Sequence, residues 1–464
     1  MTAAELSASY DLIVIGGGPA GLAAAATAAQ AGLATVLFDE NPGVGGQIYR
    51  GITANPVRNR AILGDDYWAG AALAAEAKSS GALIVNGATV WSLDRTLTVG
   101  ISIAGQARLI QGKRVIIATG SLERPFPIPG WTLPGVMTAG GAQTLLKAQG
   151  LVPSGRTVLA GSGPLLWLLA AQILRAGGKL EAIVDTGSKR NWLRAAMHLP
   201  DFLLSPYFKK GLALLREVKA KALIIPGTRI AAIGTDKLRE VDVDGRRLPA
   251  DLLLLHQGVV PNVNLANAAG VAHRWDRRQL CFVPLLDENF QGSVPGIAVA
   301  GDSAGIAGGT AAAERGRIAA IAAVRALKPE AKVPDPQTAR QRLQHEEMGR
   351  AFLDELYRPL PELRRPEGET IACRCEEVTA KQIRETARMG CEGPNQMKAF
   401  LRCGMGPCQG RLCGLTVTEL IAEERRTTPD EVGYYRLRPP VKPITLGELA
   451  SLPISEAERK AVER

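Results

Sequence analysis

Cysteine is absent from most of the chain. The first 280 of the 464 residues contain none, so this stretch holds neither a redox-active cysteine pair nor a peroxidatic cysteine. Cys281 stands alone, and we interpret it as a small buried apolar residue. The other six cysteines fall between residues 373 and 413. A secreted disulfide scaffold distributes its cysteines through a short chain, so a local group in a long chain favours a metal or redox site.

Several other features are scarce. Aromatic residues make up 5% of the chain, which argues against a stacking platform for single-stranded nucleic acid, and no long run of Lys and Arg points to nucleic-acid binding. No stretch of 18 large apolar residues is present, and residues 1–10 lack the basic and apolar regions of a secretory signal. We therefore expect a cytoplasmic protein without a transmembrane segment, for which peripheral docking to a membrane stays open.

Glycine is abundant, at 51 of 464 residues, or 11% against a usual value of about 7%. It follows no Gly-X-Y period, so the excess indicates turns and close backbone approaches. The length predicts two to four domains. The formal charge of +10 indicates a basic solvated surface or, alternatively, a face for an acidic partner or an anionic ligand.

The first segment has the order strand, glycine turn, helix, strand and acid. An apolar run at 11–15 enters the sequence Gly-Gly-Gly-Pro-Ala-Gly at 16–21, a helix follows to about Ala31, and a second strand at 34–38 ends on Asp39 and Glu40. Gly16 allows the tight turn, Gly18 lets the backbone approach a pyrophosphate, and Gly21 lets the helix pack on the strand. Asp39 follows Gly18 by 21 residues, the distance at which an acid accepts hydrogen bonds from ribose.

A second unit of this kind begins near residue 156. A strand at 156–160 enters Gly-Ser-Gly-Pro-Leu-Leu at 161–166, a helix runs to about Ala176, and the strand at 180–184 ends on Asp185. Leu166 stands where the third glycine belongs, and its side chain would push the helix off the strand or crowd a pyrophosphate. The pattern predicts a second nucleotide-type domain, whereas its use as an NAD(P) site stays open.

Two further buried strands end in small residues, at 114–120 and at 296–302, and a helix is expected from Glu314 to about Leu327. Residues 330–370 are rich in charge and proline, which predicts a connector. The segment 434–453 carries four prolines without clear periodicity, so it is either a disordered terminus or a tail wrapped on this chain or on a partner.

Residues 8–330 resemble flavoproteins with two dinucleotide-binding domains, the glutathione-reductase-like α/β fold. The resemblance implies that the first unit binds FAD and that Asp302 accepts hydrogen bonds from the ribityl chain, with capping of the next helix as the alternative. Another adenine nucleotide is the alternative occupant of the first unit. The implied FAD residues are Gly16, Gly18, Pro19, Ala20, Gly21, Asp39, Glu40, Gly46, Gln47, Thr119, Gly120, Gly301 and Asp302.

The clustered cysteines have the spacing C-x-C-x32-C-x4-C over Cys373, Cys375, Cys408 and Cys413. Four thiolates suit a [2Fe–2S] cluster or a structural zinc ion. The first three positions resemble the small helical bacterioferritin-associated-ferredoxin-like [2Fe–2S] domain, which usually ends in C-x2-C. Cys403 with Cys408 is the competing pair, since four residues also separate them. We interpret Cys391 as structural.

Longer strings resemble the α subunits of heteromeric opine and amino-acid dehydrogenases, a family that includes octopine and nopaline oxidases, D-hydroxyproline dehydrogenase and hydrogen cyanide synthase. They occupy residues 45–50, 134–142, 256–262, 404–411 and 438–443. His256, in the third string, follows a predicted strand, and we expect it to contact flavin or to be structural. This resemblance covers nearly the whole chain.

The family resemblance implies a division of labour between subunits. A β subunit similar to glycine and D-amino-acid oxidases oxidises the C–N bond, and the α subunit moves the electrons to an external respiratory or quinone acceptor. FMN at the subunit boundary and a small γ subunit are further implied components, for which no motif is visible here. The alternative is a self-sufficient NAD(P)H-dependent flavin reductase that feeds its own cluster.

These interpretations predict five segments. The FAD-binding domain is split between 1–125 and 255–330, and the second nucleotide-binding domain occupies 126–254. A connector at 331–370, the [2Fe–2S] domain at 371–425 and an extended tail at 426–464 follow.

Overall fold

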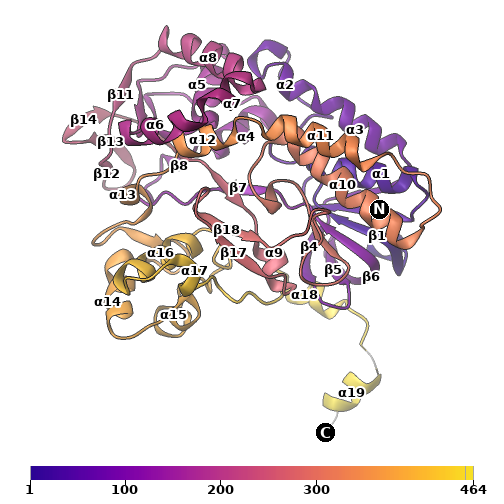
Figure 1. Ribbon diagram of the computed structural model, residues 1–464. Helices are drawn as coiled ribbons and strands as arrows, with labels where there is room; N and C mark the ends of the chain where they lie inside the picture. Colours follow the sequence, from indigo (N-terminus) through magenta and orange to yellow (C-terminus); the bar gives the residue numbers. More distant parts are fainter. Residues whose placement is uncertain (1, 455, 463–464) are drawn as a thin grey trace.

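The computed structural model describes residues 2–454 and 456–462. It has the predicted fold class, two α/β units followed by a small helical domain that carries the clustered cysteines (Figure 1). Among these residues, no helix is both long and apolar enough to cross a membrane.

The first α/β unit is built on a seven-stranded sheet. Strands β3, β2, β1, β6 and β19 run parallel, and β5 and β4 continue antiparallel from β6. Helices α1 and α10 pack on each other against one face through alanines, which allow the close approach. The bounds are β1 Ser9–Ile15, β2 Thr35–Asp39, β3 Leu83–Asn86, β4 Thr89–Leu93, β5 Thr98–Ile103, β6 Gln106–Ile117, β19 Ile297–Val299, η1 Ala3–Glu5, α1 Pro19–Gln30, η2 Arg60–Ile62, α2 Asp65–Trp68, α3 Gly70–Ser79, η4 Gly301–Ala304 and α10 Gly309–Leu327.

The second unit is inserted between β6 and β19 of the first. Its parallel sheet has the order β11-β10-β9-β15-β8, and a three-stranded antiparallel sheet lies beside it. The apolar runs at 157–162 and 252–257 are buried on both faces of the parallel sheet. The bounds are β8 Val136–Thr138, α4 Ala139–Gln149, β9 Thr157–Ser162, α5 Pro164–Arg175, β10 Ala182–Asp185, α6 Lys189–Ala195, η3 Ala196–His198, α7 Leu199–Leu204, α8 Pro206–Lys219, β11 Ile224–Pro226, β12 Ile230–Gly234, β13 Leu238–Val243, β14 Arg246–Pro249 and β15 Leu252–Gln257.

Short elements link the two units and the connector lies over them. Helix α11 contacts α10, and α12 contacts α6 of the inserted unit, so the connector joins both. The bounds are β7 Ser121–Glu123, β16 Val259–Pro261, α9 Asn264–Ala268, β17 His273–Asp276, β18 Cys281–Pro284, α11 Pro336–Glu347, α12 Arg350–Leu356 and α13 Pro361–Arg364.

The cysteine domain is a small helical unit with its own core. Ile383, Met397, Val417 and Leu420 are fully buried in it. Its helices begin at strong local signals, such as the Thr379 capping box at the start of α14. The bounds are β20 Ile371–Cys373, β21 Val378–Thr379, α14 Ala380–Arg388, α15 Pro394–Leu401, α16 Gly414–Glu424 and α17 Pro429–Val432.

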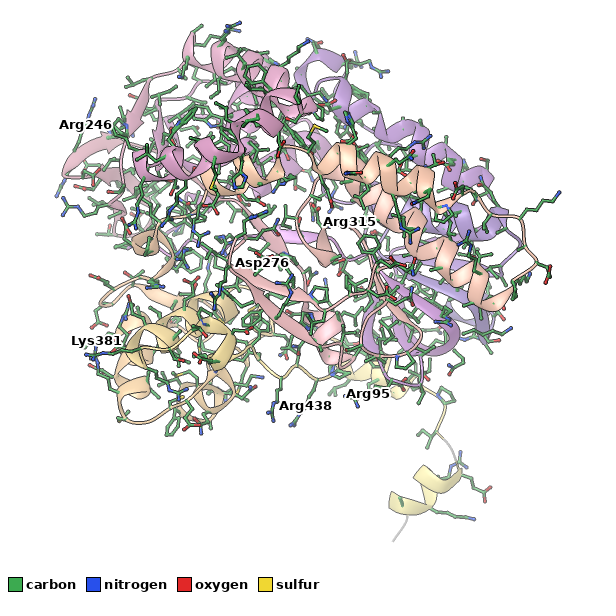
Figure 2. All side chains as sticks on the ribbon, viewed as in Figure 1. Arg95, Arg246, Asp276, Arg315, Lys381 and Arg438 are labelled. Atoms are coloured by element: carbon green, nitrogen blue, oxygen red, sulfur yellow. The ribbon has the colours of Figure 1, made fainter. Side chains whose placement is uncertain are left out.

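The C-terminal tail is wrapped on this chain over residues 434–451. Tyr435 is buried in the cysteine domain, and Val441 is buried against the first unit, where its N–H donates to the Trp91 carbonyl at 2.8 Å. Further on, the Ala107 N–H donates to Oγ of Ser451 at 2.8 Å, beside helix α18 (Leu446–Ala450); helix α19 (Glu456–Val462) follows. Arg438 lies on the stretch that crosses between the two domains (Figure 2). The tail therefore fastens the cysteine domain to the first unit.

Candidate cofactor sites

The first glycine turn forms a tight cradle at the start of helix α1. A Cβ atom at Gly21 would overlap the Gly16 carbonyl, and one at Gly16 would overlap the Ala118 carbonyl. A Cβ atom at Gly46 would lie 2.8 Å from Cα of Gly18, so a second loop meets the turn backbone to backbone. Glycine is required at these three positions because nothing larger fits. Helix α1 begins at Pro19, which has no N–H to leave unpaired, and the next N–H, that of Ala20, together with the positive end of the helix suits a pyrophosphate.

The acids at the end of β2 are held by polar contacts within the chain. Asp39 is buried, and its carboxylate accepts hydrogen bonds from the N–H groups of Gly17 at 2.5 Å and Asn41 at 2.8 Å. Glu40 is more exposed and pairs with Lys442 of the tail at 2.6 Å. Asp39 therefore holds the glycine turn to β2, and Glu40 holds the tail to the same end of β2. The predicted adenosine ribose would bind at this end.

Asp302 lies on the short helix η4, opposite the glycine turn. Its Oδ1 accepts hydrogen bonds from the N–H groups of Ala307 at 3.0 Å and Gly308 at 3.1 Å. Helix α10 begins only at Gly309 and its N-cap is Gly308, so Asp302 orders the loop before that helix and does not itself cap it. Gly301, at φ +75°, is close to Ala20 of α1, which brings the two ends of the predicted FAD site together.

The loop after β2 is anchored to the second unit by a buried lysine. Nζ of Lys147, on α4, donates to the carbonyls of Gln47 at 3.2 Å and Ile48 at 3.0 Å, and to Oε1 of Gln143 at 2.9 Å. Burial, together with the nearby Arg50 charge, lowers the pKa of Lys147 to about 7. No signal in the sequence distinguished this lysine from a surface residue.

The second glycine turn differs from the first at its third position. Leu166 is fully buried among apolar side chains between α5 and the sheet. At the equivalent position of the first unit, Gly21 has no side chain, and α1 packs directly on the glycine turn. The loop itself faces the buried His256, whose Nδ1 lies 2.6 Å from Oε1 of the partly buried Glu123. A Cβ atom at Gly163 would lie 3.2 Å from Nε2 of His256. The sequence singled out His256 but not Glu123, its partner 133 residues away.

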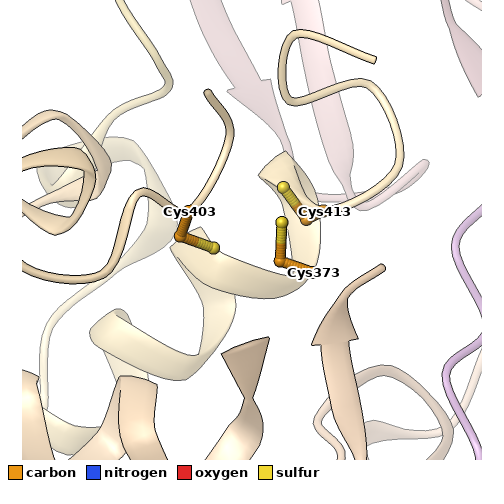
Figure 3. A group of neighbouring side chains, drawn as sticks. All are labelled: Cys373, Cys403 and Cys413. Atoms are coloured by element: carbon orange, nitrogen blue, oxygen red, sulfur yellow. The ribbon is translucent and has the colours of Figure 1, made fainter. Parts of the chain in front are cut away.

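The structure gathers the thiols of the cysteine domain. The Sγ atoms of Cys373, Cys403 and Cys413 lie within 4.8 Å of one another in a buried group (Figure 3). Cys408 is hydrogen-bonded to Cys413 and to Cys375. Cys375 and Cys408 are partly exposed, whereas Cys413 is buried. All four predicted ligands are therefore brought together, and Cys403, the competing candidate, lies among them.

Two other cysteines are separate from this group. Cys391 is buried with its thiol 3.5 Å from the Gly393 carbonyl. Cys281 is buried, and this burial raises the pKa of its thiol to about 12, which makes it unreactive at neutral pH. Both observations agree with the structural roles expected of them.

Hydrogen bonds connect the gathered thiols and change their pKa values in opposite directions. Hydrogen bonds from Cys403 and then Cys413 lower the pKa of the Cys373 thiol to about 2, and the contact with Cys373 raises the pKa of Cys403 to about 12. A thiolate is the form that binds metal, so this group is prepared for a soft cation that displaces the remaining protons. The donor set fits zinc or a [2Fe–2S] cluster, because both accept four thiolates.

Two tyrosines of the tail enter the cysteine loops, a contact that the sequence patterns did not predict. The ring of Tyr435 lies against Gly404 and Gly410, and that of Tyr434 lies against Gly414; a Cβ atom at any of these glycines would overlap a ring. Gly404, Gly410 and Gly414 were the available signal in the sequence, since each marks a close approach by another part of the chain.

The cysteine loops touch the segment that borders the predicted flavin site. Oγ1 of Thr119 donates to the Asn262 carbonyl at 3.2 Å, and the Asn262 N–H donates to the Gly120 carbonyl at 2.9 Å. Two residues on, Nδ2 of Asn264 donates to the carbonyl of Gln409, the neighbour of Cys408, at 2.9 Å. A short path of bonded residues therefore links the two predicted cofactor sites.

Family models match most of the chain. Residues 10–325 match the pyridine nucleotide-disulphide oxidoreductase family, and residues 368–452 match the sarcosine oxidase A3 domain. The second match spans the cysteine domain and the tail together, in line with the packing of Tyr434 and Tyr435.

Curated relatives are similar over nearly their full length. The A subunit of opine oxidase from Agrobacterium tumefaciens (strain Ach5) is 48% identical over 99% of this chain and 95% of its own. The HcnB subunit of hydrogen cyanide synthase from Pseudomonas aeruginosa is 32% identical over 95% of this chain and 98% of its own. Among solved structures, L-proline dehydrogenase from P. horikoshii has a TM-score of 0.71 at 20% identity, over 95% of this chain and 79% of that chain. The structural likeness supports the fold.

Proposed function

The chain belongs to the family of opine oxidase A subunits, and on that basis we propose that it is the electron-transferring α subunit of a heteromeric opine or amino-acid dehydrogenase. Relatives in this family are named as subunits, so the chain works together with other subunits. This membership favours the subunit role over that of a self-sufficient NAD(P)H-dependent reductase.

For the first glycine turn we propose FAD as the ligand. The cradle of Gly16, Gly18 and Gly46 admits a pyrophosphate, which the N-terminus of α1 favours electrostatically. We propose that Gln47, Thr119 and Gly120 also contact FAD, because Gly46 lies against Gly18 and a Cβ atom at Gly16 would lie 3.3 Å from the Thr119 nitrogen. The family match to an oxidoreductase domain supports this assignment.

For the thiol group we propose a [2Fe–2S] cluster held by Cys373, Cys375, Cys408 and Cys413. Cys403 then remains a buried thiol beside the cluster. The choice of Cys408 with Cys413 over Cys403 with Cys408 rests on the 32-residue gap that separates Cys375 from Cys408 in the sequence. When bound, a flavin accepts two electrons together, whereas such a cluster passes them on one at a time.

The observation that carries the proposal is the bonded path from Thr119 through Asn262 and Asn264 to Gln409. It holds the cysteine loops against the wall of the predicted flavin site within one chain. Oxidation of an amine C–N bond to an imine releases two electrons and two protons. Two linked cofactor sites in this chain suit the onward transfer of electrons that are released on another subunit. The absence of cysteine before residue 281 leaves no dithiol that could take those electrons instead.

Further components of the complex are part of the same proposal. We expect a β subunit similar to glycine and D-amino-acid oxidases to oxidise the substrate, with FMN at its boundary with this chain, and we expect a small γ subunit in the same complex. A respiratory quinone is the proposed acceptor, and this choice favours peripheral attachment to a membrane. We propose a cytoplasmic location because residues 1–10 lack the regions of a secretory signal.

The test is a comparison of the lone chain with the reconstituted complex. The chain would be purified with its genomic neighbours, and reduction of its flavin followed by stopped-flow absorbance with a panel of opines and amino acids. We expect rapid bleaching by one substrate class in the complex and slow bleaching of the lone chain by NADH or NADPH. Rapid bleaching of the lone chain by either nucleotide would contradict the proposal.

A further inference from the structure

Helices α6 and α7 and the turn η3 between them belong to the inserted unit (Figure 1). They carry an exposed apolar surface. Five large apolar side chains within 13 residues are between 47% and 79% exposed, an unusual density for a surface in contact with water. We call this the α6–α7 surface, and its members are Trp192, Leu193, Met197, Leu203 and Leu204.

The helices that carry this surface are firmly packed on their other side. Ala195 is fully buried against Phe352 of α12, and the rings of Phe202 and Phe352 stack with centroids 4.1 Å apart. Nδ2 of Asn191 donates to the Arg358 carbonyl at 2.7 Å, and Ser188 caps α6. Trp192 also meets the Phe352 ring edge to face, with centroids 5.9 Å apart, so it contributes to this packing. Leu193, Met197 and Leu204 are presented outward by an ordered scaffold.

Positive charge is concentrated in the same part of the sequence. Residues 189–221 contain eight Lys and Arg against two Asp and Glu, a net charge of +6 out of the +10 of the whole chain. On the surface itself Lys189, Arg190 and Arg194 alternate with the apolar residues and are exposed. None of the three is in an ion pair with any residue that the structure describes. The surface thus combines large apolar side chains with unneutralised cations.

We propose that the α6–α7 surface docks on an anionic lipid membrane, an inference that rests on the proposed respiratory acceptor. A bilayer surface is complementary to both kinds of side chain. Its anionic headgroups attract the cations, and its acyl boundary accepts Trp, Leu and Met side chains. The stems of Lys and Arg can lie along the apolar layer while their charges reach the headgroups.

The shape of the surface favours the same occupant. Leu193, Met197 and Leu204 are each more than three-quarters exposed, so they project from the protein as separate side chains. A fluid bilayer closes around such projections, whereas a rigid partner would need a matching pocket for each. Docking in this way would bring the electron-transfer subunit to the phase in which quinones dissolve.

The experiment is co-sedimentation of the full chain with vesicles of neutral phosphatidylcholine, with and without phosphatidylglycerol. We expect binding to the mixed vesicles that weakens as salt is added, and little binding to the neutral ones. The triple variant K189Q/R190Q/R194Q should bind the mixed vesicles roughly a hundredfold more weakly, since each basic residue near the membrane contributes about a fivefold factor.

A second variant tests the apolar part of the surface. The double substitution Leu193→Glu and Leu204→Glu should abolish vesicle binding without unfolding the protein, because both side chains are exposed. Its matched control, Met389→Glu with Leu446→Glu, alters two residues that are equally exposed on other parts of the chain. A charge control removes three exposed cations that lie outside α6 and α7, Arg95→Gln, Arg277→Gln and Arg438→Gln, two of which are labelled in Figure 2.

The outcomes separate this proposal from its alternatives. Failure of the wild-type chain to bind anionic vesicles, or equal loss of binding in the control variants, would overturn it. If the surface variants instead stop co-purifying with the other subunits, the surface is a subunit interface and the membrane assignment is wrong. Substrate-dependent reduction of a soluble dye by the complex should be the same in all variants, and its absence in the wild type would count against the proposed function only.

Discussion

The hydroxyl of Tyr435 lies 3.7 Å from Sγ of Cys413, although 22 positions separate the two residues in the chain. The Tyr435 ring reaches this place because Gly404 and Gly410 leave room for it. Burial raises the pKa of Tyr435 above its usual value, so the hydroxyl keeps its proton at neutral pH and can donate it in a hydrogen bond to sulfur. The tail thereby takes part in the candidate metal site.

Removal of this hydroxyl should change the redox properties of the bound cluster. A hydrogen bond to a ligand sulfur stabilises the reduced, more negative state, so its loss lowers the reduction potential. We expect Tyr435→Phe to lower the potential by roughly 40 mV, the one-electron equivalent of about 1 kcal/mol for one hydrogen bond. Potentiometric titration followed by electron paramagnetic resonance measures the shift.

Tyr434→Phe is the matched control for that experiment. The Tyr434 hydroxyl donates to the Gly410 carbonyl at 3.4 Å and has no sulfur partner among the described residues. Its removal should leave the potential within a few millivolts of the wild type. Equal shifts in the two variants would mean that general loosening of the loops, and not the hydrogen bond, sets the potential.

Cys403→Ser addresses the choice of the four ligands. If Cys403 is a bystander, the variant retains iron, sulfide and the visible spectrum of the wild type, whereas Cys408→Ser loses them. Chemical analysis of iron and acid-labile sulfide per chain decides between these results. A cluster that survives in Cys413→Ser but not in Cys403→Ser would instead identify Cys403 with Cys408 as the ligand pair.

The glycine cradle can be tested by adding one methyl group. Gly21→Ala places Cβ against the Gly16 carbonyl, so the turn must open and bound FAD should fall from near one per chain to a small fraction. The flavin-to-protein absorbance ratio reports it. Gly211→Ala is the control, because a Cβ atom there meets nothing within 4 Å and alanine favours the α8 helix. Full flavin content in Gly21→Ala would refute the assigned site.

Lys147 should make stability depend on pH. Its pKa of about 7 in the folded protein is lower than the ordinary lysine value of 10.5, so between these pH values the unfolded chain binds more protons. The free energy of unfolding should therefore rise with pH over this interval, by up to about 1.4 kcal/mol per unit. Denaturant unfolding at several pH values measures the slope, and Lys147→Met should remove this contribution. A slope that is unchanged in Lys147→Met would show that another group is responsible.

Local patterns predicted the parts of the fold that depend on neighbours in sequence. The nucleotide-type turn at 16–21 could be predicted because its glycines, the helix and the following acid all lie within 25 residues. The second turn could be predicted for the same reason. The gathering of Cys373 with Cys413 was expected from their spacing. The partnership of Glu123 with His256 was not, since residue spacing across 133 positions carries no signal of contact.

The fold class, the two nucleotide-type units and the grouping of thiols follow from the sequence alone, because strand periodicity, glycine spacing and cysteine spacing are short-range properties. Three other features emerge only in the folded chain: Glu123 pairs with His256, Tyr435 reaches Cys413, and five apolar residues of α6, η3 and α7 remain exposed. Each of these depends on which segments meet in space. That is set by the packing of whole domains, in which a tail from the end of the chain and a loop before α16 come together.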